Sequence, residues 1–260
     1  MKFSEAANTL YAFVWHEFCD WYLEFSKPVL YGEDSKHKQS TQLVLAQTLN
    51  RIVRLLHPFI PFITEEIYQK LPIHDESCVI ADYPTLENDK TWLALGSKEA
   101  AFKVEMMKRV ITAIRNIRGE NSIKPGEKIA VWLEPKGEAS RKILSDSKAE
   151  IMRLGSLSAC ELSSPESLSK CAISPLNIEG SEINVIVPLE GLVDIEKEIS
   201  RLSKAIEKNE KEIKKLSGKL NNKRFIENAP ADVVEADKAL LAQFESKVQH
   251  MQSSLLRLKD

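Results

Sequence analysis

The sequence predicts a mainly α-helical protein in three parts: a helical bundle over residues 1–118, a small α+β unit over 119–190 and an antiparallel coiled-coil hairpin over 191–260. Three patterns lead to this prediction. Apolar residues before Gly119 recur at three- and four-residue steps, the period of an amphipathic helix. Short β-branched segments bounded by Gly, Pro or Ser follow. From Gly191 the apolar spacing alternates between three and four, as in a coiled coil.

The bundle is expected to contain several helices separated by polar or proline-rich loops. The first covers residues 3–27 and ends at Pro28, because proline disrupts a helix interior. A second helix begins near Thr41. Thr64 and the two glutamates that follow it indicate another helix N-terminus, where a capping hydroxyl and negative charge are favourable. A long helix over roughly 98–118 completes the bundle.

The central unit is expected to hold four short strands, at 128–135, 159–163, 170–178 and 183–190. Each segment is rich in β-branched residues and is bounded by residues that favour turns. One helix, at about 138–154, lies between the first two strands. Strands and a helix in this order predict a small α+β unit.

The last part of the chain contains two matching apolar seams separated by a break at Asn228–Pro230. The first seam consists of Leu192, Ile195, Ile199, Leu202, Ile206, Ile213, Leu216 and Leu220, and the second of Val234, Leu241, Phe244, Val248, Met251, Leu255 and Leu258. Asn209 fills the polar position of the first seam. Because the seams can cover each other within one chain, we expect a helical hairpin, an arm about 45 Å long.

Composition bounds the class of protein. A hydrophobic content of 43% can fill real cores, and a net charge of −2 argues against a chain that is basic throughout. Residues 1–11 lack the apolar core of a signal peptide, and no uncharged run reaches the roughly 20 residues of a membrane span. The four cysteines are scattered, which indicates reduced thiols. We therefore expect a soluble cytoplasmic protein.

No catalytic or metal site is expected from the sequence. The five histidines are dispersed, no glycine-rich phosphate loop follows a strand, and no HExxH motif or paired ligand cluster is present. The segment Lys215–Lys219, with the sequence Lys-Leu-Ser-Gly-Lys, is similar to a catalytic lysine loop. However, Leu216 and Leu220 occupy seam positions, so this segment is predicted to lie inside a helix.

Positive charge is concentrated in two segments of the chain. Residues 103–128 carry seven basic residues against three glutamates, and residues 211–224 carry six against one. A solvated coiled-coil face usually mixes both signs, so this asymmetry favours a phosphate backbone as the partner. From charge alone, a solvated face is an equally good interpretation.

Five segments of the chain occur in an order known from one enzyme family. They are ANTLYAFVWHEFCDWYLEFSKP, LHPFIPFITEEIYQKL, IRNIRGENSIKPGEKI, VPLEGLVDIEKEISRLSKAI and NKRFIENAPADVVEADK. Together they resemble the C-terminal part of bacterial valyl-tRNA synthetases, and the last two point to the valyl family in particular. The His-Ile-Gly-His and Lys-Met-Ser-Lys-Ser motifs of that family's catalytic domain do not occur here. The editing domain and the first helix of the bundle are also missing, so the resemblance implies a fragment that is inactive alone.

The resemblance implies an anticodon-binding bundle at residues 1–118 and, at 191–260, an arm that holds the outer corner of tRNA(Val). ATP and Mg²⁺ would belong to the missing catalytic domain of the parent enzyme, so no cofactor is expected here. The expected tRNA contacts in the bundle are Lys108, Arg109, Arg115, Arg118 and Asn121. Those in the arm are Lys211, Lys215, Lys219, Lys223 and Arg224 for phosphates, with Phe225 as a stacking group.

Two other interpretations of the sequence stay open. A stand-alone interaction module would use the heptads for an intermolecular coiled coil and would have no tRNA role. The second seam and the Pro-containing turn favour a monomeric hairpin instead. An independent enzyme would turn over ATP and valine without any partner.

Overall fold

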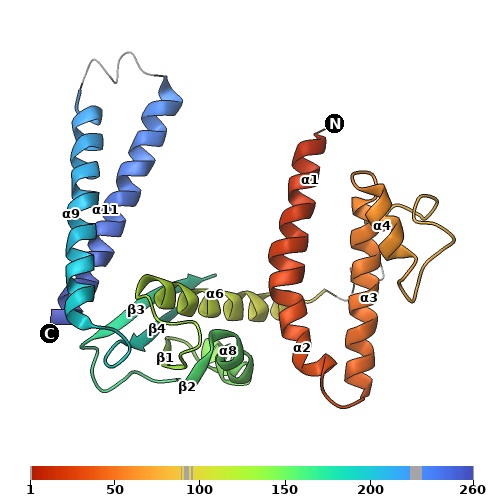
Figure 1. The fold of residues 1–260 in the computed structure, drawn as a ribbon, viewed down its shortest axis with the longest axis horizontal. Helices are drawn as coiled ribbons and strands as arrows, with labels where there is room; N and C mark the ends of the chain where they lie inside the picture. The colour runs from red at the N-terminus through yellow and green to blue at the C-terminus, as the bar shows by residue number, and fades with distance from the viewer. Residues whose placement is uncertain (1, 89, 91–93, 95, 223–229, 260) are drawn as a thin grey trace. The chain divides into compact units, whose positions relative to one another are not determined.

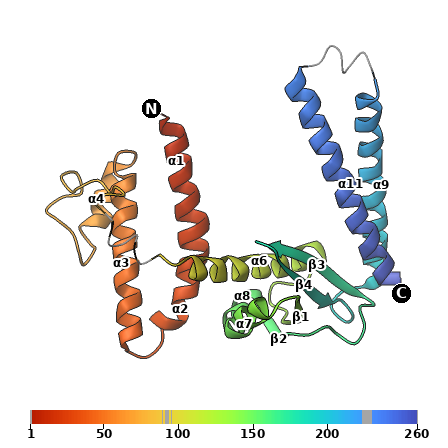
Figure 2. The same ribbon diagram turned by 180° about the vertical axis from the view of Figure 1, so that it is seen from behind.

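The computed structural model describes residues 2–88, 90, 94, 96–222 and 230–259. The chain divides into two compact units, residues 1–101 and 102–260. The first is helical, and the second combines helices with one small mixed sheet (Figures 1 and 2). A mainly helical α+β fold is therefore confirmed. The domain limits expected at 118 and 190 stay predictions.

The first unit begins with a continuous helical stretch of three segments: α1 (Phe3–Ala12), η1 (Phe13–Leu23) and α2 (Glu24–Leu30). η1 is a π-helix, a rare conformation that apolar spacing does not reveal. The prediction that Pro28 ends the helix is wrong, because Pro28 stands within the last turn of α2. Its missing N–H disturbs little there, since the helix ends at Leu30.

Two predicted helix starts in this unit are also wrong. α3 (Lys36–Leu56) begins before Thr41, because Ser35 caps it: the Ser35 Oγ accepts a hydrogen bond from a backbone N–H of the first turn at 3.1 Å. α4 (Pro61–Tyr68) begins before Thr64, because the fixed φ of proline suits the first helical position. The core of this unit is the buried cluster Val53, Tyr68 and Cys78.

The second unit is built on a four-stranded sheet in the order β2-β1-β4-β3. Its strands are β1 (Ile129–Pro135), β2 (Leu157–Glu161), β3 (Cys171–Ile178) and β4 (Ser181–Pro188). β1 and β2 pair in parallel, and the other two pairings are antiparallel. Each strand was expected within two residues of its observed limits.

Three helices accompany the sheet. α6 (Lys98–Glu120) matches the expected long helix. The helix expected at 138–154 is divided into α7 (Glu138–Asp146) and α8 (Lys148–Gly155). Ser147 separates them because its φ of −106° and ψ of 11° leave the helical region. Together α7 and α8 form the crossover that a parallel β1–β2 pair requires. The core of the unit includes the fully buried Val110, Ile114, Val131, Leu133, Leu144 and Val185.

Two long helices, α9 (Ile195–Leu220) and α11 (Ala231–Lys259), lie side by side and run in opposite directions (Figures 1 and 2). Every residue of the two predicted seams is buried or half-buried. The segment Lys215–Lys219 lies inside α9, as predicted. The backbone N–H of Lys170 donates to Arg257 O at 2.8 Å, which ties the end of α11 to the start of β3. Coiled-coil packing between the two helices stays a prediction.

Within the described part of the chain, no helix combines the length and the apolar character needed to cross a membrane.

Candidate nucleic-acid interface

The basic residues of α6 lie in different environments. Lys108 and Arg109 share one carboxylate: Lys108 Nζ lies 3.3 Å from Glu105 Oε2, and Arg109 Nε donates to Glu105 Oε1 at 3.0 Å. Arg109 is well exposed, whereas the Lys108 side chain is only 16% exposed. Arg115 is also exposed, and its Nη2 donates to Leu154 O at 3.3 Å. Arg109 and Arg115 therefore face solvent, and Lys108 lies against the protein.

Arg118 holds the loop that follows α6. It is only 8% exposed. Its Nη2 donates to three backbone carbonyls, those of Lys124 at 2.9 Å, Pro125 at 3.3 Å and Glu127 at 2.6 Å. Charge-assisted hydrogen bonds of this kind are among the stronger ones in proteins. Arg118 is thus occupied inside the protein, while Lys124 and Lys128 of the same loop are exposed.

Asn121 is also directed inward. It is 9% exposed, and its Nδ2 donates to Ile117 O at 2.8 Å. The backbone N–H of Asn121 donates to the same carbonyl at 3.1 Å, so Ile117 O accepts both bonds from Asn121. Ser122 follows with a φ of +54°, a left-handed conformation that turns the chain away from the helix. The Asn121 side chain is therefore buried at the end of α6, and its contact with an anticodon base stays a prediction.

The arm lysines expected to bind phosphate take part in ion pairs along α9. Lys211 Nζ donates to Glu207 Oε1 at 2.8 Å, and Lys215 Nζ donates to Glu212 Oε1 at 2.7 Å. The hydrogen bond raises the pKa of Lys211 and lowers the pKa of Glu207. Both lysine side chains are about 70% exposed, at 69% and 71%. These lysines therefore stay accessible although each has a partner.

Lys219 pairs across the two helices of the arm. Its Nζ lies 2.6 Å from Asp237 Oδ2, and the Asp237 side chain is only 15% exposed. This pair links the end of α9 to the first half of α11. The remaining expected contacts, Lys223, Arg224 and Phe225, lie outside the described residues.

Sequence reasoning missed how much of this positive charge has a carboxylate nearby. The spacing could have shown it, because Glu207 and Lys211 are four residues apart, and Glu212 and Lys215 are three apart. It also left Lys214 out of the expected contacts, although this residue lies in the same turn and is exposed. On the distal half of α9, exposed lysines and glutamates therefore lie next to each other.

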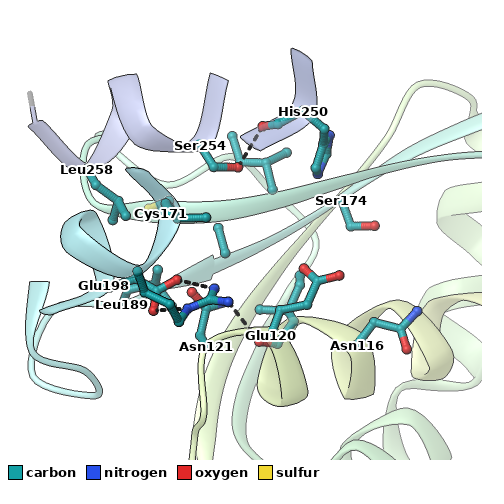
Figure 3. Close-up of a pocket in the computed structure, with 15 residues that line it drawn as sticks. Asn116, Glu120, Asn121, Cys171, Ser174, Leu189, Glu198, His250, Ser254 and Leu258 are labelled. Carbon is teal, nitrogen blue, oxygen red and sulfur yellow. Dashed lines mark hydrogen bonds and ion pairs between the residues drawn. The ribbon is translucent and has the colours of Figure 1, made fainter. Parts of the chain in front are cut away.

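A cavity of about 110 Å³ lies at the base of the arm, lined by residues of α6, β3, α9 and α11. Figure 3 shows Asn121 and Glu198 on one side of it and His250 and Ser254 on the other. Arg201 Nε donates to Glu198 Oε2 at 2.8 Å, and this bond is the main cause of a raised Arg201 pKa. The Glu198 side chain is only 7% exposed. An ion pair between the buried Glu198 carboxylate and the half-exposed Arg201 guanidinium therefore lies where the arm meets the end of α6.

Two protein-family models match the chain. Residues 1–133, more than half of it, match the anticodon-binding domain of tRNA ligases. Residues 194–259, which contain α9 and α11 up to its last residue, match the tRNA-binding arm of valyl-tRNA synthetases.

Relatives of the chain carry the name valine–tRNA ligase. The protein from Bdellovibrio bacteriovorus is 48% identical over 258 residues, which is 99% of this chain and 29% of that protein. The protein from Enterococcus faecalis is 36% identical over 99% of this chain and 28% of its own length. The protein from Listeria monocytogenes is 43% identical over 91% of this chain and 26% of its own length. The chain thus spans less than a third of these relatives. It belongs to the anticodon-binding domain family of tRNA ligases and corresponds to the C-terminal, tRNA-binding part of valyl-tRNA synthetases.

Proposed function

We propose that this chain binds tRNA(Val), with the α-helical part up to α6 at the anticodon region and the arm at the outer corner of the molecule. The observation that carries this proposal is the match of α9 and α11 to a tRNA-binding arm. The exposed lysines on the distal half of α9 support it, because neutralising phosphates releases condensed counterions.

The basic residues divide into contacts and positioning residues. Arg109, Arg115, Lys211, Lys214 and Lys215 are exposed, so they are proposed phosphate contacts. Arg118 and Asn121 are buried and donate to backbone carbonyls through Nη2 and Nδ2, so they act by shaping the loop after α6. That loop brings the exposed Lys124 to the surface, and we add this residue to the proposed contacts.

The ion pairs on the arm are compatible with phosphate binding. Exposed ion pairs contribute little to stability, because water and salt screen them. Lys211 and Lys215 can therefore exchange a carboxylate for a phosphate without a large penalty. Lys219 differs, since Asp237 is shielded from solvent; we propose that this pair fixes the two helices relative to each other.

Binding of this kind would serve the ATP-dependent attachment of valine to tRNA(Val) by a catalytic domain. Contacts remote from the reacting end of a substrate help to select and orient it. The catalytic motifs of the family do not occur in this sequence. We therefore propose that the chain acts as a monomeric tRNA-positioning part of a cytoplasmic ligase, while ATP and Mg²⁺ are used elsewhere in that enzyme.

An intermolecular coiled-coil module is the less favoured function. α9 and α11 already cover each other's apolar faces within one chain. Light scattering after size-exclusion chromatography separates the two functions: a tight dimer that does not bind tRNA would favour the module.

Salt dependence tests the role of the arm directly. With five phosphate contacts, the slope of log K against log salt should be about −3.5 to −4.5. Replacing the exposed Lys211, Lys214 and Lys215 with Gln should reduce the slope by about 2 to 3, because each lost contact contributes roughly 0.7 to 0.9. Fluorescence anisotropy with labelled tRNA measures both values.

A matched control uses three other lysines of the same helix. Lys197, Lys204 and Lys208 are exposed and lie nearer the base of α9. Replacing these three with Gln removes the same charge and should leave most of the slope intact. If both triple variants reduce the salt slope equally, phosphate binding is not concentrated on the distal half of α9. Such a result would indicate general attraction by charge.

A further inference from the structure

The first unit brings together three side chains that can bind a metal ion. His57 follows the last residue of α3, Glu65 lies on α4, and Cys78 lies in the loop after α4. One donor atom of each, the imidazole nitrogen, a carboxylate oxygen and the thiol sulfur, lies within 4.8 Å of the other two. The three residues come from different segments, so no local sequence motif predicts this cluster.

The imidazole of His57 is oriented by a hydrogen bond. Its Nδ1 lies 2.9 Å from Thr64 Oγ1, and the Thr64 hydroxyl donates to Ile60 O at 2.9 Å. Because the hydroxyl hydrogen is used on the carbonyl, Nδ1 is assigned as the donor to Thr64, and the lone pair stays on Nε2. Metal-binding histidines are commonly held by such a bond from their second nitrogen.

The carboxylate of Glu65 is held by three hydrogen bonds. Oε1 accepts from Gln69 Nε2 at 2.7 Å, and Oε2 accepts from Ser77 Oγ at 3.0 Å and from Cys78 N at 2.9 Å. A carboxylate offers about four lone-pair positions, so Oε1 keeps one for a cation. The bond to Cys78 N also fixes the backbone from which the buried thiol projects.

We propose that His57, Glu65 and Cys78 bind Zn²⁺, with water as the fourth ligand. Nitrogen, oxygen and sulfur donors together suit zinc better than Mg²⁺ or Ca²⁺, which prefer oxygen alone. The ligand atoms of tetrahedral zinc lie about 3.5 Å apart. Side-chain rotations that move the three donor atoms by roughly 1 Å would therefore bring them to ligand distance. A hollow lined by His57, Glu65 and Ser77 borders the donors and leaves room for the water.

The proposed ion would tie the loop after α4 to the end of α3. The loop is already anchored at Cys78, which belongs to the buried cluster with Val53 and Tyr68. Binding would lower the free energy of the folded first unit, because the unfolded chain does not hold these donors together. This role is independent of tRNA binding.

Cobalt substitution tests the site. The chelator-treated protein is titrated with Co²⁺, and we expect a sulfur-to-cobalt charge-transfer band that saturates at one ion per chain and is displaced by Zn²⁺. Cys78→Ser should abolish the band, and His57→Gln should weaken Co²⁺ binding by at least about tenfold. Cys19→Ser is the matched control and should keep the band, since Cys19 lies outside the cluster.

Thermal unfolding gives a second readout. Zn²⁺ should raise the midpoint of the unmodified protein and leave that of Cys78→Ser unchanged. Absence of the charge-transfer band in the unmodified protein would overturn the proposal, and so would a band that persists in Cys78→Ser. If circular dichroism shows that Cys78→Ser does not fold, the His57→Gln variant provides the test. A Co²⁺ affinity of His57→Gln equal to that of the unmodified protein would reject the site.

Discussion

Replacing Arg118 tests whether this residue shapes the loop after α6 or binds tRNA itself. Arg118→Met keeps much of the buried aliphatic stem but removes the donor to the carbonyls of Lys124, Pro125 and Glu127. One charge-assisted hydrogen bond contributes about 1.5 to 3 kcal/mol. Water can replace the bonds at the exposed Lys124 and Pro125, whereas the half-buried Glu127 has the shortest bond, at 2.6 Å. We therefore expect the loop to open more easily by about 2 to 3 kcal/mol.

Amide hydrogen exchange measures this loss locally. The N–H of Ile123 donates to Arg118 O at 2.9 Å, and the N–H of Glu127 donates to Lys124 O at 3.0 Å. Exchange at these two amides should accelerate roughly 30- to 150-fold, since each 1.4 kcal/mol is a factor of ten. Amides of the β3–β4 ladder serve as the internal control and should change little. Unchanged exchange in the loop, or equal acceleration throughout the unit, would refute the local role.

The tRNA readout separates positioning from contact. If Arg118 only shapes the loop, Arg118→Met should weaken tRNA binding but keep the salt slope. A lost phosphate contact would instead reduce the slope by about 0.9. Arg118→Lys keeps the charge but cannot present the same planar group of donors, so it should restore only part of the loop's protection.

Three further changes test other parts of the structure. Gly218→Ala should stabilise the arm by about 0.5 to 1 kcal/mol in urea unfolding, because Gly218 lies inside α9 and an added Cβ meets nothing within 4 Å. A hydrogen bond from Ser164 lowers the pKa of Glu134, so the ionised carboxylate stabilises the folded protein above pH 4.5, and this contribution is lost as the pH falls through the lowered pKa. Glu134→Gln should therefore make the free energy of unfolding depend less on pH in the acid range. A double-mutant cycle of Lys219→Ala and Asp237→Ala should give a favourable coupling energy, and additive effects would contradict the link between α9 and α11.

Periodicity was sufficient to predict the long elements. The seam residues of α9 and α11, the span of α6 and the four strands all depend on which face of an element is buried, and that face is visible in the spacing of apolar residues. The same argument correctly placed Lys215–Lys219 inside a helix.

Boundaries depended on local chemistry that the apolar pattern does not contain. Ser35 starts α3 through a capping bond, and Pro61 starts α4 through its fixed φ. Pro28 is tolerated because the helix ends in the same turn. Ser147 interrupts an otherwise continuous amphipathic pattern, so the division into α7 and α8 was not foreseen.

Individual site residues were harder still, because a basic side chain can face either solvent or the protein. Arg115 and Arg118 are three residues apart on α6, yet one is exposed and the other is buried against backbone carbonyls. Their charges are identical, and only the path of the loop that follows distinguishes them. The approach of His57 to Cys78 likewise depends on tertiary structure between separate segments.

The most direct test of tRNA binding compares valine-specific and isoleucine-specific tRNA transcripts. Anisotropy titrations with this chain should show tighter binding of the valine transcript, with a salt slope near −4. The variant that replaces Lys211, Lys214 and Lys215 should lose more than half of that slope. Failure to bind either transcript, or binding that does not respond to salt, would contradict the proposed function.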